Sequence, residues 1–184
     1  MSDQPNPAGL QDLLAQLETR QRHDPHDTLV RLAVRLRARD ACEYCLLPAK
    51  GLFHVDHIIP PDLWIDYAVG NVPGLTPVPE RRGPDHLDNL AWCCPFCNGS
   101  KAWRVTARIG GQSQRLFDPR RDTWQEHFTF MHQYLFVIGV TPIGQATERV
   151  LAPNRPGLNG PLGTRHDAIV EGHYPPWWAR GWLV

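Results

Sequence analysis

The chain has 184 residues, of which 42% are hydrophobic, and its 19 basic and 19 acidic side chains give a formal net charge of zero. This length predicts one domain with appendages and a modest core, which argues against a fully disordered chain. The neutral charge excludes a protein that coats nucleic acid by bulk charge, although a local basic face remains compatible with it. Because no apolar run approaches ~18 residues and the N-terminus lacks the pattern of a secretory signal, we expect a cytoplasmic protein without membrane spans.

The N-terminal part predicts two helices. Residues 1–26 form a polar appendage in which leucines at helical spacing predict a short surface helix: Leu10, Leu13, Leu14 and Leu17. Residues 27–39 predict a second helix. Its arginines at 31, 35 and 39 lie four apart and share one face, which is either a solvated face or, beside a nucleic-acid site, a row of phosphate contacts.

The middle of the chain predicts a strand, a loop and a helix. Residues 52–59 are rich in apolar and β-branched types and predict a strand. Residues 61–88 contain many prolines and glycines and predict one long loop, which the short apolar stretch 89–92 follows. Residues 98–108 predict a helix that Gly110-Gly111 would stop.

The C-terminal part is rich in aromatic residues. It predicts a short helix over 122–127 and then two strands. A further helix begins with Thr141 as N-cap and Pro142 at its first position, and runs to about Leu151. The tail from Pro153 onward is rich in Pro and Gly and predicts little regular structure. We expect three tryptophans in the core: Trp92, Trp103 and Trp124.

The five cysteines predict a metal site. Their odd number and the lack of an export signal argue against a disulfide framework. Four of them form two C-x2-C pairs, Cys42 with Cys45 and Cys94 with Cys97, and two such turns can close a tetrahedral zinc site. Redox-active or unliganded thiols are the alternative. Cys93 is either a packed small residue or a competitor of Cys94 in register.

The strand between the two pairs carries the chemistry. Side chains alternate along a strand, so His54 and Asp56 share one face and His57 points to the other. Asp56 can ligate a hard divalent ion, and His57 can take a proton from water near neutral pH. His54 either supports the metal face or is an ordinary packed or exposed histidine. Because Asn98 follows the second cysteine pair, a zinc clasp would bring it towards Asp56.

Three segments, CEYC, HVDHIIP and DNLAWCCPFCNGSK, together resemble the HNH nuclease family in its branch with a four-cysteine zinc site. RLFDPRRDTWQEHF followed by GVTPIGQAT resembles the extension of bacterial HNH endonuclease-like proteins, so the resemblance covers about residues 31–155. It implies an α+β fold: a ββα-metal (His-Me finger) core clasped by a four-cysteine zinc site, with N-terminal helices and a C-terminal strand/helix extension. The implied segments are a nuclease domain over 27–112, an extension packed on the core over 113–153, and a tail over 154–184.

The resemblance also implies roles for individual residues. Asp56 resembles the metal-binding acid, and His57 resembles the general base. Asn89 resembles the middle asparagine, which holds the loop between the strands by backbone hydrogen bonds. Asn98 takes the place of the final histidine, a metal ligand, and its neutral oxygen favours Mg²⁺ or Mn²⁺ as the catalytic ion.

One segment departs from the family pattern. The loop before Asn89 is short and carries Gly-Gly in the family, but here it is long and Pro-rich and contains Trp64 and Tyr67. It is a specificity loop, a cover or a partner site.

The implied activity is metal-dependent hydrolysis of phosphodiester bonds in nucleic acid, DNA more than RNA. The alternative is a catalytically inactive zinc-clasped module that binds nucleic acid or protein. Residues 91–122 hold six basic and two acidic residues (+4), whereas residues 40–90 hold three basic and eight acidic ones (−5). A basic face with Lys101, Arg104 and Arg108 is therefore expected to bind the substrate, although Lys101 is either a phosphate contact or an ordinary solvated lysine.

Overall fold

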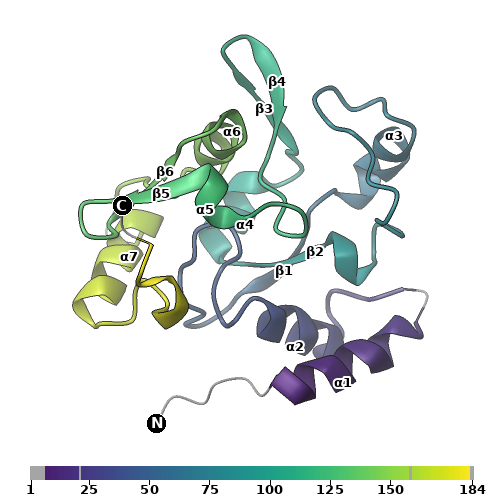
Figure 1. The fold of residues 1–184 in the computed structure, drawn as a ribbon, viewed down its shortest axis with the longest axis horizontal. Coiled ribbons are helices and arrows are strands. Elements are labelled where there is room, and N and C mark those ends of the chain that lie inside the picture. Colours follow the sequence, from purple (N-terminus) through teal and green to yellow (C-terminus); the bar gives the residue numbers. More distant parts are fainter. Residues whose placement is uncertain (1–6, 21, 158, 183–184) are drawn as a thin grey trace.

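The computed structural model describes residues 7–20, 22–157 and 159–182 and shows a mixed α+β chain (Figure 1). The described strands pair into three separate antiparallel hairpins: β1 (His54–His57) with β2 (Leu90–Cys93), β3 (Thr106–Ile109) with β4 (Gln112–Arg115), and β5 (Phe128–Met131) with β6 (Phe136–Gly139). The α+β class expected from the sequence is confirmed. None of the described helices is both long and apolar enough to cross a membrane.

Two helices, α1 (Pro7–Glu18) and α2 (Thr28–Arg37), pack together at the start of the described chain, as predicted. The carboxylate of Asp27 caps α2 by accepting two N–H bonds of its first turn, at 2.7 and 3.2 Å. Leu17 of α1 is fully buried in the main core. The polar appendage expected over 1–26 therefore contributes to the core, while its first six residues lie outside the described part.

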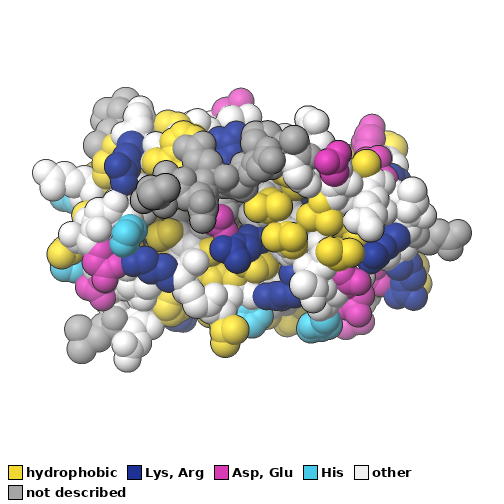
Figure 2. Space-filling model, turned by 90° about the horizontal axis from the view of Figure 1, so that it is seen from below, with side chains coloured by type: hydrophobic (Ala, Val, Ile, Leu, Met, Phe, Trp, Pro, Cys, Tyr) yellow, Lys and Arg dark blue, Asp and Glu magenta, His cyan; other side chains and the backbone are white. Residues whose placement is uncertain are grey.

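The α1 and α2 side of the molecule carries charges of both signs. Acidic, basic and histidine side chains are interspersed there around a group of hydrophobic side chains (Figure 2). The described residues of this side therefore form no large field of one sign.

The centre of the molecule is the β1–β2 hairpin followed by helix α4 (Pro95–Lys101). In the hairpin His54 lies opposite Cys93, and His57 lies opposite Leu90. Helix α4 packs against β1. The segment 61–88 lies between β1 and β2, and α4 follows β2 directly.

The segment 61–88 is not the single long loop that its prolines predict. It contains a 3₁₀ turn, η1 (Pro61–Leu63), and a short helix, α3 (Trp64–Ala68), and a second 3₁₀ turn, η2 (Leu87–Asn89), closes it. Proline is accepted at the first position of η1 because its missing N–H would have had no partner there. Tyr67 is buried and anchors the segment in a small second core, which it shares with Ile59 and Val105.

The helix predicted over 98–108 is wrong at both ends. Helix α4 begins at Pro95 because Cys94 acts as its N-cap, and it ends at Lys101. Gly110 and Gly111 do not stop a helix but form the two-residue turn between β3 and β4, with φ of 57° and 83°. Glycine adopts these left-handed angles without steric cost, so this pair was a hairpin signal.

The elements predicted between residues 115 and 151 are confirmed. Helix α5 (Trp124–His127) precedes the β5–β6 hairpin, and α6 (Pro142–Leu151) follows it. The Thr141 hydroxyl caps α6 by accepting the Gly144 N–H at 3.2 Å. Gly144 also permits close packing, because a Cβ there would lie 2.0 Å from the His127 carbonyl oxygen.

The C-terminal tail is more regular than its composition predicts. It forms helix α7 (Pro161–Val170) and a 3₁₀ turn, η3 (Trp177–Ala179). Arg165 of α7 is fully buried; it donates to the Leu135 carbonyl at 3.0 Å, and its guanidinium lies over the Tyr174 ring. The expectation of little regular structure fails because tertiary contacts, which composition does not report, hold this segment.

One buried cluster joins the four segments expected from the sequence, since it includes Leu17, Leu90, Trp124 and Tyr174. Trp92 and Trp124 are buried, as predicted. Trp103 is not: it is 70% exposed. It follows Ala102, whose φ of 48° ends α4 and takes the chain off the helix axis.

Candidate metal centre and active site

The two C-x2-C pairs meet in the interior. The sulfurs of Cys42, Cys45, Cys94 and Cys97 all lie within 4.8 Å of one another, and all four residues are buried. Zinc bonds sulfur at about 2.3 Å, so the sulfurs of a tetrahedral site lie about 3.8 Å apart. The distance between the sulfurs of Cys45 and Cys94 is 3.8 Å. The four cysteines could hold a metal ion, and their donor set is that of a structural zinc site.

Local backbone structure aims both pairs at the centre. In the first turn the Cys42 N–H donates to the Leu47 carbonyl at 2.8 Å, and the Cys42 carbonyl accepts the Leu46 N–H at 2.9 Å. In the second turn the Cys94 sulfur accepts the Cys97 N–H at 3.4 Å, which caps α4. Each turn is therefore a closed loop that presents two sulfurs.

The C-terminal half of the chain supports the first turn. The Trp124 indole N–H donates to the Tyr44 carbonyl at 3.0 Å, and the Tyr174 hydroxyl donates to the Cys45 carbonyl at 3.0 Å. The cluster of four cysteines therefore lies at the junction between the two halves of the molecule.

The charge state of the thiols favours a cation. Hydrogen bonding with Cys42 and burial raise the pKa of Cys94 and Cys97 well above the usual thiol value. Burial acts to raise the pKa of Cys42 as well, but bonds from the surrounding thiols outweigh it and lower this pKa well below its usual value. A divalent ion bound between the four sulfurs would favour the thiolate form of all four cysteines.

Cys93 lies outside this set. It is fully buried at the end of β2 and is not among the four clustered cysteines. Burial raises its pKa well above the usual thiol value. It is therefore a packed thiol, the first of the two alternatives that the sequence left open.

Asp56 lies on the closed side of β1. Its carboxylate, in a residue that is 7% exposed, accepts the Tyr44 hydroxyl at 2.9 Å and the Lys101 ammonium at 3.0 Å. Lys101 also donates to the His57 carbonyl at 2.7 Å. Burial raises the pKa of Asp56, and Lys101 offsets this only in part.

This pairing corrects the expectation for Lys101. The residue is 1% exposed and its ammonium is held by Asp56, so it is not placed to contact a phosphate. A lysine is buried only with a partner for its charge, and Asp56 supplies that partner. Neither alternative from the sequence, phosphate contact or solvated lysine, fits.

Asn98 precedes Lys101 by three residues on α4, and residues three apart share one helix face. It therefore shares a helix face with Lys101, which contacts Asp56. Asn98 is half-buried, and its side-chain amide makes no hydrogen bond to any described residue.

A hard divalent ion beside Asp56 would need oxygen donors. The only described partner of Asp56 Oδ1 is Lys101, at 3.3 Å, so this oxygen keeps free acceptor capacity, as does the amide oxygen of Asn98. These two oxygens are the kind of donor that a hard divalent ion takes, while the positive charge of Lys101 opposes such an ion.

Asn89 uses all of its hydrogen-bonding capacity. Its side chain accepts the Ile59 N–H at 2.9 Å and donates to the carbonyls of Ile59 and Pro84, each at 2.8 Å. Arg81 donates to the same side-chain oxygen at 2.7 Å. Asn89 is fully buried and ties the end of β1 to the start of β2. These are backbone bonds of the kind that the resemblance implies.

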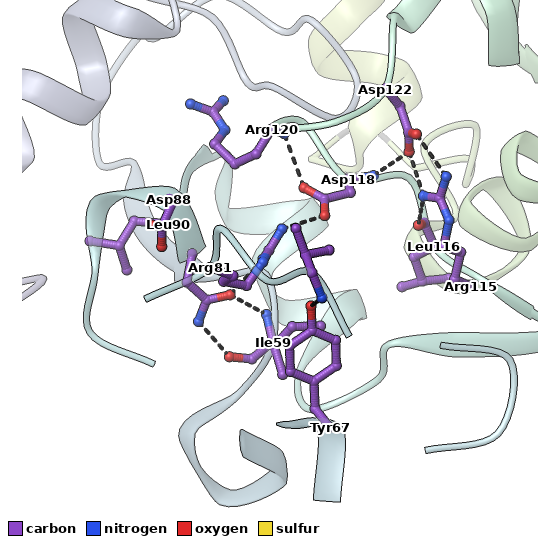
Figure 3. Close-up of polar contacts among 12 residues, drawn as sticks. Ile59, Tyr67, Arg81, Asp88, Leu90, Arg115, Leu116, Asp118, Arg120 and Asp122 are labelled. Atoms are coloured by element: carbon purple, nitrogen blue, oxygen red, sulfur yellow. Dashed lines mark hydrogen bonds and ion pairs between the residues drawn. The ribbon is translucent and has the colours of Figure 1, made fainter. Parts of the chain in front are cut away.

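Arg81, which binds Asn89, begins an ionic network that is largely buried (Figure 3). Arg81 is paired with Asp118, which lies in the segment after β4. Asp122 accepts the Asp118 N–H at 2.9 Å and binds Arg115 through both of its oxygens, at 2.5 and 2.7 Å. The network links segment 61–88 and the extension over 113–153 to the β1–β2 hairpin.

His57 lies on the opposite side of β1 from Asp56, as the alternation predicts, and its side chain is 22% exposed. Its Nε2 is 3.1 Å from Asp85 Oδ1, and Arg22 binds the other oxygen of Asp85 at 2.6 Å. The bond from Arg22 is the largest of the influences that lower the pKa of Asp85. His54 is exposed and has no side-chain hydrogen bond among the described residues.

Asp85 is the site residue that sequence reasoning missed. It lies in the Pro-rich insertion, 28 residues after His57, and no motif spacing marks it. The sequence did offer one signal, the short distance along the chain from Asp85 to Asn89. The role predicted for Asn89 brings the end of segment 61–88 back to β1.

The predicted basic residues divide into two groups. Arg115 and Arg120 are taken up by internal ion pairs with Asp122 and Glu43. Arg104, beyond the end of α4, and Arg108, on β3, are exposed. The basic surface is thus smaller than a count of charges predicts.

No family model, no curated protein and no solved structure matches this chain. Its function is therefore argued from the geometry of the site and from the motif residues themselves.

Proposed function

We propose that this protein is a metal-dependent endonuclease of the HNH type, which hydrolyses phosphodiester bonds in DNA. The observation that carries the proposal is the position of Asp56 against α4. The cysteine cluster holds the helix against the hairpin, and Lys101, on the same helix face as Asn98, contacts Asp56. Zinc is the ion proposed for the four cysteines, with a structural role.

His57 is the proposed general base. Its Nε2 faces Asp85, so a proton on that nitrogen leaves Nδ1 as the basic nitrogen for an attacking water. Arg22 holds Asp85, and Asp85 holds the ring. A base positioned in this way contributes about 10²–10⁴-fold in rate.

Asp56 and Asn98 are the residues that would hold Mg²⁺ or Mn²⁺. When bound, such an ion neutralises charge that develops on the scissile phosphate and on the leaving oxygen. Asn89 keeps β1 and β2 in register, so that Asp56 and His57 stay on opposite sides of one strand.

A second function has one specific observation in its favour. The Lys101 ammonium already neutralises Asp56, as it would in a zinc-clasped binding module without a catalytic ion. In that case the chain would bind nucleic acid or protein without cutting it.

Incubation of zinc-loaded protein with supercoiled plasmid separates the two functions. The metal-free control omits Mg²⁺ and Mn²⁺ instead of adding a chelator, since a chelator also extracts zinc. Nicking that follows added Mg²⁺ or Mn²⁺ and is lost in His57→Ala, but not in His54→Ala on the same strand, supports the nuclease. Tight binding without strand breaks supports the module.

A further inference from the structure

A groove lies between α4 and α6, outside the Asp56 site. It has a volume of about 440 Å³ and is lined by Pro95, Phe96, Gly99, Ser100, Arg104, Val150, Ala152 and Arg155. The lining includes two arginines and no carboxylate. Helix α6 also packs against β3, where Arg149 donates to the Arg108 carbonyl. Arg104 and Arg155 thus line the groove, and Arg108 and Arg149 lie on the adjoining β3 and α6.

These arginines are free of ion pairs. Arg104, Arg108, Arg149 and Arg155 are all exposed, and none is paired with a carboxylate in the part of the chain that the structure describes. Arg104 donates to the Ser100 carbonyl at 2.7 Å, which uses one of its five N–H groups. In a chain of zero net charge, two unpaired arginines in the groove and two more on the adjoining β3 and α6 provide a local binding region for anions.

Trp103 adds an exposed aromatic side chain next to Arg104 in the sequence. It precedes Arg104 directly and is 70% exposed. A single exposed hydrophobic residue needs no explanation by itself. An exposed indole next to unpaired arginines, however, is the combination by which proteins bind unpaired nucleotides, with bases stacked on the ring and phosphates on the cations.

We propose that Trp103, Arg104, Arg108, Arg149 and Arg155 form a binding surface for unpaired nucleic acid. The proposal rests on the nuclease function for its substrate class, and it names the form of that substrate. The faces of bases inside a duplex are covered by their neighbours, whereas unpaired bases can stack on Trp103. The protein therefore prefers single-stranded DNA, or the unpaired part of a branched DNA, over a continuous duplex.

Binding is measured by fluorescence anisotropy with zinc-loaded full-length protein and without Mg²⁺ or Mn²⁺, so that the DNA stays intact. The probes are a labelled single-stranded oligonucleotide of mixed sequence and the duplex of the same sequence. Trp103→Ala should weaken single-strand binding about 10-fold and duplex binding much less, and Trp103→Phe should keep most of the affinity. Arg104→Gln with Arg155→Gln should weaken binding of both probes and flatten its salt dependence.

Matched controls come from the C-terminal segment. Trp177 is 59% exposed and Arg180 is also exposed. Both belong to the segment around η3 and not to α4, β3 or α6, so Trp177→Ala and Arg180→Gln should bind like wild type. The proposal is overturned if Trp103→Ala binds the single strand like wild type, if Trp177→Ala loses as much affinity, or if wild type prefers the duplex.

The nuclease function and the surface can fail separately. Trp103-dependent binding in a protein that never nicks plasmid would support the surface and reject the nuclease. Nicking by a protein whose Trp103→Ala variant binds and cuts like wild type would support the nuclease and reject the surface.

Discussion

The two sides of strand β1 differ in their exposure to solvent and in the partners of their charged side chains. On one side Asp56 is enclosed by Tyr44 and Lys101, with the cysteine cluster and α4 behind it. On the other side His57 is partly exposed, and its ring is held by a single carboxylate, Asp85. The first side holds charge in a fixed place, while the second can exchange protons and water with solvent.

The difference shows where rigidity is needed. A buried carboxylate is costly unless it is paired and hydrogen-bonded, so the Asp56 side must be closed by firm contacts. The general base proposed for the His57 side must reach water, which agrees with the partial exposure of that side. The substitutions below test whether the closed side carries stability and the open side carries activity.

The largest effect is expected from loss of the cysteine site. Structural zinc contributes about 10–16 kcal/mol in small zinc domains, as much as or more than the roughly 5–15 kcal/mol of net stability of a typical protein. Cys97→Ala should therefore abolish stoichiometric zinc and cooperative folding. Elemental analysis and near-UV circular dichroism measure the two losses.

Cys93→Ala is the matched control, because Cys93 is equally buried but outside the cluster. It should keep one zinc per chain and a folded core. If Cys93→Ala lost zinc while Cys97→Ala kept it, the ligand set would be wrong.

His57→Ala should lower the rate of DNA cleavage by about 10²–10⁴-fold with little change in stability, because the ring is partly exposed and makes one polar contact. The rate of plasmid nicking and the thermal midpoint are measured together. Cleavage at the wild-type rate by this variant would show that His57 is not the general base.

Lys101→Met should destabilise the protein by about 3–5 kcal/mol, because it leaves the buried carboxylate of Asp56 without its cation. Urea unfolding of the zinc-loaded protein measures this loss. The double variant with Asp56→Asn should recover part of it, and Arg104→Met, an exposed cation near the same helix, should have little effect. Equal stability of Lys101→Met and wild type would mean that the pair is not buried as described.

The smallest effect is expected from Asp85→Asn, which keeps the shape but removes the charge beside His57. We expect cleavage about 10-fold slower, with partial rescue by Asp85→Glu, because a lost orienting carboxylate usually costs less than the group that it orients.

The pKa of Asp85 is lowered in the folded state, so its ion pairs stabilise the fold above about pH 4 and this contribution is lost as the pH falls through the folded pKa. The difference in unfolding free energy between wild type and Asp85→Asn should therefore shrink below about pH 4. A difference that grows in acid would contradict this assignment.

Local patterns made much of the closed side predictable. C-x2-C spacing constrains two sulfurs within one turn, and strand alternation separates Asp56 from His57. The caps at Asp27 and Thr141 were readable for the same reason, since a cap acts within a few residues of itself.

Contacts across long stretches of chain were not predictable. Lys101 follows Asp56 by 45 residues in the sequence, and Asp85 follows His57 by 28. Both pairings depend on how segment 61–88 folds. The Gly110-Gly111 pair was ambiguous, because the same residues can end a helix or turn a hairpin. The prediction of little regular structure in the tail was wrong because the contacts of Arg165 and Tyr174 hold this segment in place.

A titration of zinc-loaded protein with Mn²⁺, followed by electron paramagnetic resonance, tests most directly whether the closed side holds a catalytic ion. We expect wild type to bind one Mn²⁺ per chain. Asn98→Ala should lose the Mn²⁺ while it keeps its fold and its zinc, and His54→Ala should still bind the Mn²⁺. No Mn²⁺ bound by wild type, or equal binding by Asn98→Ala, would contradict the shared site of residues 56 and 98.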